Sequence, residues 1–145
     1  MSENEICTII LDSAFKIHRK LGPGLFESDY KECLLYELVK SNIKVLPEKA
    51  IPLIYEDVKM DIGFRADLLV ENKVVVEIKS IEGLHDVHKK QLLTYIRLAD
   101  CKLGLLINFN ELLLKDGIKR VVNNLKKKFH AASAANRSVR REKQI

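Results

Sequence analysis

The stretch from Ile62 to Ser80 constrains the fold of this chain more than any other. Apolar and polar residues alternate along two runs with an Asn-containing loop between them. Side chains on a strand point alternately to opposite faces, so the pattern predicts two paired strands. The expected apolar sets are Ile62, Phe64, Ala66, Leu68 and Val70 on the first strand, and Val74, Val76 and Ile78 on the second. The opposite face then carries Gly63, Arg65, Asp67 and Leu69, with Val75, Glu77 and Lys79 beside them.

The burial of these apolar sets fixes the register of the hairpin. Directly opposed residues of an antiparallel pair share a face, so burial of both sets in one core selects one pairing. That pairing opposes Val70 to Val74, Leu68 to Val76, Ala66 to Ile78 and Asp67 to Glu77. It requires an odd loop centred on Asn72, because a two-residue turn would place the carboxylates on opposite faces. The β-carbons of Asp67 and Glu77 are then roughly 5 Å apart, with Lys79 further along the same face.

Two adjacent carboxylates and a lysine indicate metal-dependent chemistry on phosphate esters. Mg²⁺ prefers oxygen ligands, commonly one or two carboxylates with waters and phosphate oxygens. Such an ion polarises a phosphodiester and lowers the pKa of its water, while a lysine can orient that water or offset developing charge. An alternative remains open on spacing alone: a solvated strand face with a cross-strand acid pair and a salt-bridging lysine.

Four ordered motifs resemble one known family. Asp67 followed by Glu77-Ile78-Lys79 is similar to the D-(x)n-E-x-K signature of the PD-(D/E)XK nuclease superfamily. The stretch from Gly24 to Tyr30 matches the GxxExxY motif of a family within it. The segments Gln91–Tyr95 and Gly104–Phe109 also resemble that family, so that the resemblance covers roughly residues 5 to 122.

The resemblance implies a fold and roles for further residues. The fold would be a restriction-endonuclease-like three-layer α/β sandwich, with a mixed central sheet flanked by helices. Glu27 would join Asp67 and Glu77 at the metal, together with the carbonyl of Ile78. Gln91 would assist Lys79 in positioning water or a backbone phosphate. Superfamily relatives often form homodimers, so self-association is expected.

Three further residues are candidates with open alternatives. Tyr30 lies at helical spacing from Glu27 and would pack beside the site, bond a carboxylate or serve the core. Tyr95 shares a helix face with Gln91, and both could equally be polar boundary positions. Arg65 precedes Asp67 by two residues and could contact phosphate or a neighbouring acid.

Periodicity and breakers predict the remaining elements. Helices are expected at about 5–21, 26–41 and 86–98, an irregular edge strand containing two prolines at 44–55, an interior strand at 102–109 and a short edge strand at 117–123. His85 and His88 could suggest a metal pair, but a solvated helix start is the simpler interpretation without a third ligand. Cys7, Cys33 and Cys101 are odd in number and widely spaced, which argues against disulfides or a zinc site.

The basic residues are unevenly distributed. Residues 119–145 hold nine Lys or Arg and one Glu, so residues 1–118 carry a net charge of −3. We therefore predict one domain at 1–123 and a basic tail at 124–145, which either contacts phosphates or only aids solubility. No apolar run approaches the ~20 residues of a membrane span, and the N-terminus lacks a signal-peptide pattern, so a cytoplasmic location without membrane association is expected.

The function predicted from these patterns is an Mg²⁺- or Mn²⁺-dependent nuclease-like phosphodiesterase acting on nucleic acid, with DNA favoured over RNA. Asp67, Glu77, Ile78 and Glu27 would hold the metal, and Lys79 and Gln91 would act on water. A second hypothesis keeps the fold but makes the chain a catalytically silent module that binds nucleic acid or protein. A third makes it a subunit of a larger complex.

Overall fold

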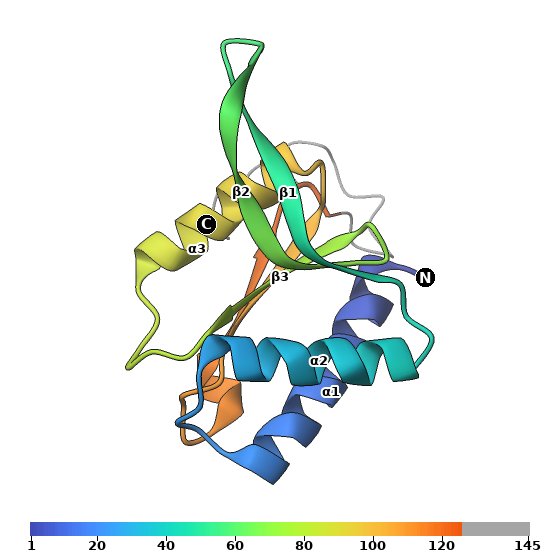
Figure 1. The fold of residues 1–145 in the computed structure, drawn as a ribbon, viewed down its shortest axis with the longest axis vertical. Coiled ribbons are helices and arrows are strands. Elements are labelled where there is room, and N and C mark those ends of the chain that lie inside the picture. Colours follow the sequence, from blue (N-terminus) through green and yellow to red (C-terminus); the bar gives the residue numbers. More distant parts are fainter. Residues whose placement is uncertain (126–145) are drawn as a thin grey trace, which may run out of the picture.

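A computed structural model describes residues 1–125 of the chain (Figure 1). The helices are α1 (Glu3–Leu21), α2 (Glu27–Lys40) and α3 (Asp86–Leu98), with a 3-10 helix, η1 (Leu114–Gly117). The strands are β1 (Val45–Tyr55), β2 (Val58–Val70), β3 (Val74–Lys79), β4 (Leu103–Asn108) and β5 (Ile118–Val122). All predicted elements are present at close to their predicted positions, whereas the basic tail from residue 126 onwards lies outside the described residues.

The five strands form one mixed sheet in the order β1-β2-β3-β4-β5. Only β3 and β4 are parallel, and α3 makes the crossover between them. β4 is buried along its whole length, as expected for an interior strand. β1 and β5 are the edge strands, which confirms both predicted edges.

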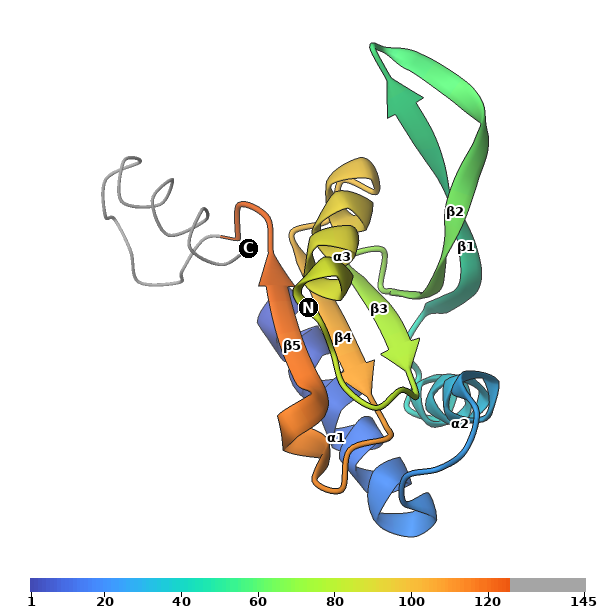
Figure 2. The same cartoon turned by 90° about the vertical axis from the view of Figure 1, so that its left-hand side faces the viewer.

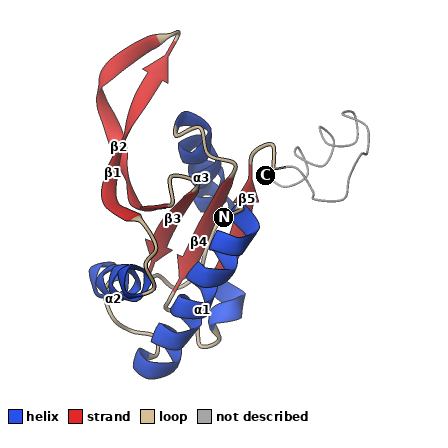
Figure 3. Cartoon of the chain, turned by 90° about the vertical axis from the view of Figure 1, so that its right-hand side faces the viewer, coloured by secondary structure: helices blue, strands red, loops and turns tan. Residues whose placement is uncertain are grey.

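Helices cover both faces of the sheet and make a three-layer α/β sandwich (Figures 2 and 3). On one face α1 and α2 bury their apolar stripes against alternate residues of β3 and β4, among them Val76, Ile78 and Leu105. On the other face α3 packs through Leu92, Leu93 and Ile96 onto a second cluster that includes Val75. The predicted mixed sheet flanked by helices is therefore confirmed.

Local signals explain where the two N-terminal helices begin and end. Ser2 caps α1, since its hydroxyl accepts from the Glu5 N–H at 3.2 Å while the Glu5 carboxylate accepts from the Ser2 N–H at 3.1 Å. The helix ends at Gly22, whose φ of 69° lies in the left-handed region that glycine adopts without strain. The chain then turns sharply into α2.

The register of the β2–β3 hairpin is the predicted one. Leu68 lies opposite Val76 and Val70 opposite Val74, leaving a three-residue loop centred on Asn72. Glu71 and Asn72 both adopt positive φ in this loop. β2 pairs with β3 only over Leu68–Val70 and Val74–Val76, because β2 turns away from β3 beyond that point, and the predicted ladder pairs Asp67–Glu77 and Ala66–Ile78 do not form.

One sequence expectation about β2 is wrong. Ala66 was expected to share a core with Ile78, but Ala66 packs in the α3 cluster while Ile78 packs with α1 and α2. The reason is a bend at the level of Asp67, where the facing residue of β1, Glu48, has a left-handed φ of 52°. Beyond the bend β1 and β2 continue as a long two-stranded arm that projects past the sheet (Figure 1).

Within residues 1–125, no helix is long and apolar enough to cross a membrane.

Candidate active site

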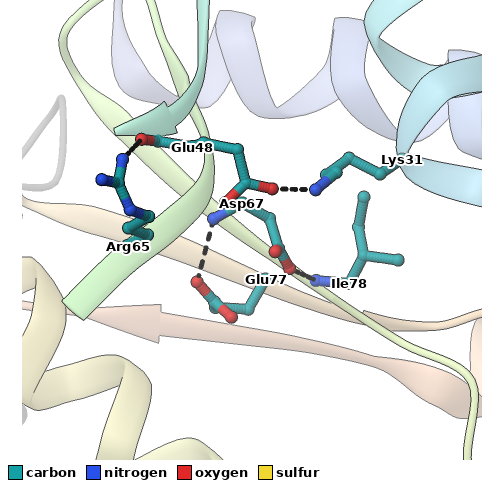
Figure 4. A network of polar contacts seen from close by, with 6 residues as sticks. All are labelled: Lys31, Glu48, Arg65, Asp67, Glu77 and Ile78. Carbon is teal, nitrogen blue, oxygen red and sulfur yellow. Dashed lines mark hydrogen bonds and ion pairs between the residues drawn. The ribbon is translucent and has the colours of Figure 1, made fainter. Parts of the chain in front are cut away.

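Asp67 and Glu77 meet where β2 and β3 separate, and each carboxylate bonds the other residue's strand (Figure 4). Glu77 Oε1 accepts from the Asp67 N–H at 3.2 Å. Asp67 Oδ2 accepts from the Ile78 N–H at 2.8 Å. These two bonds replace the strand-to-strand ladder at this level. The predicted juxtaposition of the two acids is therefore present, and it is fixed by main-chain groups.

The environment of Glu77 disfavours its charged form. Glu77 is only 9% exposed, on the face that α3 covers. Burial, and next the charge of Asp67, raise the pKa of the Glu77 carboxyl to about 8, which Lys79 partly counteracts. The solvated strand face considered as an alternative does not describe this residue, because the acid is buried beside a second acid.

Lys79 follows Glu77 at the period-two spacing that places both side chains on the α3 side of the sheet. Its positive charge lowers the pKa of the Glu77 carboxyl, so the ammonium lies within electrostatic reach of Glu77. Among the described residues the Lys79 ammonium makes no ion pair and no hydrogen bond with a side chain. The Lys79 amine thus lies near the acids without forming an ion pair with either of them.

Tyr95 and Gln91 lie on α3, the helix that covers this face of the sheet. Burial, and then the charges of Glu77 and Asp67, raise the pKa of the Tyr95 phenol, which places the phenol near both acids. The Tyr95 ring stacks on Phe64 of β2 with 4.1 Å between ring centroids. Gln91 lies one turn earlier on the same helix and is exposed. Its amide makes no hydrogen bond within residues 1–125.

The corner between α1 and α2 is tied to the end of β3, the same end that carries Lys79. Ser80 Oγ donates to the Leu25 carbonyl at 2.5 Å, and the Ser80 N–H donates to Glu27 Oε2 at 3.4 Å. Glu27 therefore lies beside Ser80, the first residue after β3, a few residues beyond Glu77 along the chain. Among residues 1–125 no group of three or more His, Cys, Asp or Glu residues is placed to hold a metal ion together.

Tyr30 is bonded to the backbone of the corner between α1 and α2. It is fully buried, and its ring stacks on Phe109 with 4.5 Å between centroids. Its hydroxyl donates to the Gly22 carbonyl at 2.6 Å and accepts from the Leu25 N–H at 3.1 Å. Of the open alternatives for Tyr30, the structure shows core packing combined with bonds to loop backbone.

Arg65 contacts the backbone of β1. Two neighbouring residues, Lys31 and Glu48, were not predicted from the sequence to lie near the site. Arg65 Nη1 donates to the Glu48 carbonyl at 3.1 Å, and the Glu48 carboxylate forms an ion pair with Lys31 of α2 (Figure 4). Lys31 follows Glu27 by one helical turn, so both lie on one face of α2. That spacing could have marked Lys31 as a neighbour of the site. Nothing in the sequence marked Glu48, whose position depends on its own left-handed backbone.

The two histidines considered as a metal pair form a helix start. His88 Nδ1 accepts from the His85 N–H at 2.9 Å, which caps the first turn of α3. The three cysteines are free thiols, and burial raises the pKa of the Cys101 thiol to about 11. These residues have no part in the candidate site.

The donor set at the two acids suits a small oxygen-preferring cation. Two carboxylates with the adjacent Ile78 carbonyl are ligands that Mg²⁺ accepts, with waters and phosphate oxygens completing the shell. The raised pKa of the Glu77 carboxyl points the same way, because a cation beside the buried Glu77 and the half-buried Asp67 offsets the repulsion between the two carboxylates.

Comparison with known proteins gives one match. The family model described as the PD-(D/E)XK nuclease superfamily matches residues 4–121. No curated protein and no solved structure matches the chain. The match covers Asp67, Glu77 and Lys79, α1 from its second residue, α2, and the whole sheet except Val122.

Proposed function

Because this chain belongs to the PD-(D/E)XK nuclease superfamily, we propose that it is a magnesium-dependent nuclease-like phosphodiesterase that cleaves nucleic acid, DNA rather than RNA. The observation that supports this most directly is the reciprocal bonding of Asp67 and Glu77 next to Lys79. The family match does not favour a silent binding module. The motif from Gly24 to Tyr30 supports placing the chain in the GxxExxY family.

Asp67 and Glu77 would hold the metal through the carboxylate oxygens that the backbone does not use. The Ile78 carbonyl and Glu27 are the further ligands we propose. Glu27 would reach the ion from beside Ser80, where its carboxylate now accepts a long bond of 3.4 Å. A bound Mg²⁺ supplies Lewis-acid polarisation of the phosphodiester and a water of lowered pKa. Mn²⁺ has the same ligand preferences and would substitute for it.

Lys79 would bind and orient the attacking water or the scissile phosphate, because its ammonium lies near the acids without an ion-pair partner in the described part of the chain. Gln91, exposed in the middle of α3, would add a hydrogen bond to the same water or to a backbone phosphate. Tyr95 would close the other wall of the site, with its phenol turned toward the acids. Arg65, at the base of the arm, would contact a phosphate further along the strand.

The residues 1–118 carry a net negative charge, so a broad positive field does not attract the substrate. Binding would rest on local groups such as Lys79, Lys31 and Arg65 and on the metal. The basic tail would add phosphate contacts. The proposal also includes a cytoplasmic location and self-association as a homodimer.

The test is cleavage of single-stranded, duplex and branched DNA and of RNA, with Mg²⁺, with Mn²⁺ and with a chelator. The variants are Lys79→Ala and Glu77→Gln, with Lys102→Ala and Glu32→Gln as matched controls. Lys102 precedes β4 at the end of the strand pair opposite to Lys79, and Glu32 is an exposed acid of α2. We expect metal-dependent cleavage by the wild type and the controls, and a loss of two or more orders of magnitude in the site variants. Equal cleavage by the site variants, or none by any folded protein with any substrate, would overturn the proposal.

A further inference from the structure

The last residue of β4, Asn108, has a polar side chain that is completely buried. Its exposed fraction is 0%, and the residues of β4 before it, from Leu103 to Ile107, are apolar or glycine. Only two polar or charged side chains are buried among residues 1–125, and the other is Glu77 of the candidate site. A buried amide costs free energy unless its polar atoms are bonded, so its partners indicate what it does there.

The Asn108 amide bonds both backbone groups of Ile81. Its Oδ1 accepts from the Ile81 N–H at 3.1 Å, and its Nδ2 donates to the Ile81 carbonyl at 3.0 Å. The backbone of a neighbouring strand would offer the same donor and acceptor, so the side chain extends the pairing of β4 beyond the end of β3. The Asn110 amide donates to the same Ile81 carbonyl at 3.2 Å.

The end of β4 therefore holds the chain on both sides of Ser80. On one side the Phe109 N–H donates to the Lys79 carbonyl at 2.9 Å, and on the other side the Asn108 amide bonds Ile81. The two parallel strands end side by side, next to the corner between α1 and α2 (Figure 2). The backbone of residues 79–81 is thus fixed by residues 108–110.

Ser80 transmits this position to the corner. Its hydroxyl donates to the Leu25 carbonyl at 2.5 Å, and its N–H donates to Glu27 Oε2 at 3.4 Å. The side chain of Asn108 is therefore connected to the Glu27 carboxylate through three consecutive residues of the chain. The same three residues begin with Lys79.

We propose that Asn108 is a positioning residue of the metal site, which places Glu27 and Lys79 by holding the backbone of residues 79–81. The inference rests on the proposed function, because that function assigns Glu27 to the metal. Asn108 is buried and does not itself contact ion or substrate. Mg²⁺ demands near-octahedral geometry, so a displaced ligand weakens its binding. Residues that orient metal ligands without touching the metal typically contribute about 10–100-fold to metal affinity.

A role confined to the stability of the sheet makes a different prediction. In that case any substitution in β4 with a similar loss of stability would affect the metal site equally. Gly104→Ala provides this comparison, because it lies four residues earlier on the same strand. Its new β-carbon would meet Leu92 and Ile96 of α3 rather than residues 79–81.

Hydrogen exchange of the metal-free protein, measured by NMR, tests whether Asn108 holds this segment. The backbone amides of Ser80 and Ile81 are compared with that of Val76 in the centre of β3. In Asn108→Ala we expect both amides to exchange up to about tenfold faster relative to Val76, because a hydrogen bond and the support of its neighbour are lost. Gly104→Ala should leave the ratio unchanged. An unchanged ratio in Asn108→Ala would overturn the inference.

Calorimetric titration with Mg²⁺ tests the effect on the site without any cleavage assay. We expect a dissociation constant about 10–100-fold higher in Asn108→Ala and a wild-type value in Gly104→Ala. Asn110→Ala, which removes one of the two donors to the Ile81 carbonyl, should show a smaller rise. This milder variant decides the question if Asn108→Ala does not fold, and a wild-type value for it would then overturn the inference.

The titration also separates this inference from the proposed function. Equal weakening in Asn108→Ala and Gly104→Ala, or none in either, would overturn the role of Asn108 while the proposed function stands. A wild type that binds no Mg²⁺ would overturn the proposed function, and the role of Asn108 toward the metal with it.

Discussion

The Glu77 carboxylate accepts the backbone N–H of Asp67 at 3.2 Å, at the level where β2 leaves β3. Asp67 in turn bonds the N–H of Ile78 at 2.8 Å. One oxygen of each acid is therefore anchored to a strand, and the pair is held in place by the groups that a regular ladder would have bonded to each other. The acids are part of the architecture of the sheet as well as of the candidate site.

The stability of the metal-free protein should fall as pH rises from about 4.5 to about 8. Burial raises the pKa of the Glu77 carboxyl from 4.5 to about 8, so the folded state holds a proton that the unfolded state releases in this range. The contribution is fully present below the lower value and lost as pH passes the upper one, and it amounts to a few kcal/mol at about 1.4 kcal/mol per pKa unit. Denaturant unfolding with a chelator, at several pH values, measures this slope. In Glu77→Gln the slope should largely disappear, and an unchanged slope would contradict the assignment to Glu77.

Mg²⁺ should raise the melting temperature of the wild type at neutral pH and release protons on binding. The ion binds the folded acid pair and displaces the proton that the raised pKa keeps on the Glu77 carboxyl, so its binding stabilises the fold. Differential scanning fluorimetry gives the shift, and calorimetry in two buffers of different ionisation enthalpy gives the proton count. Asp67→Asn should remove the shift, whereas Asp61→Asn, on the arm, should keep it. A shift that survives in Asp67→Asn would place the metal elsewhere.

Gly104→Ala should destabilise the protein by about 1–3 kcal/mol through overpacking. A β-carbon at Gly104 would lie 2.9 Å from Leu92 Cγ and 2.9 Å from Ile96 Cγ2, because α3 approaches β4 closely at this point. Gly83→Ala is the control, since a β-carbon there would meet no atom within 4 Å. Chemical denaturation compares the two. Equal free energies of unfolding would mean that α3 can move away from the sheet at little cost.

Tyr30→Phe should cost about 1–3 kcal/mol, the range for leaving buried polar groups without a partner. The Gly22 carbonyl and the Leu25 N–H would both lose their bond to the phenol. The corner that carries Glu27 would loosen, so any metal-induced shift should also shrink. Tyr36→Phe, at an exposed tyrosine of α2, should change neither quantity.

The register of the central hairpin could be predicted because one physical requirement determined it. The apolar sets around Leu68 and Val76 had to face one core, and only one pairing allowed this. That pairing also brought Asp67 to Glu77. In the same way Pro47 and Pro52 predicted an edge strand, and the unbroken apolar run of β4 predicted an interior one. Strong local patterns were therefore sufficient for the sheet.

The bend in β2 could not be predicted from the alternation. The pattern from Val58 to Val70 is continuous, so Ala66 was assigned to the wrong core. The direction of the chain changes because Glu48 adopts a left-handed backbone and because Asp67 bonds Ile78 in place of strand pairing. Both features depend on contacts between residues far apart in the sequence, where a side chain bonds a backbone group that would otherwise pair with another strand. The ion pair of Lys31 with Glu48 depends on the same bend and was missed for the same reason.

The arrangement of the core has a consequence for the order in which the chain is made. α1 and α2 are synthesised first, yet the strand residues that bury their apolar stripes come largely from β3 and β4, up to Ile107. Ribosomal synthesis therefore leaves two amphipathic helices without their main apolar cover until most of the domain has emerged. A nascent chain halted before β4 would expose the apolar stripes of α1 and α2 to chaperones. These stripes would be buried only when the last strands have been synthesised and have packed onto them.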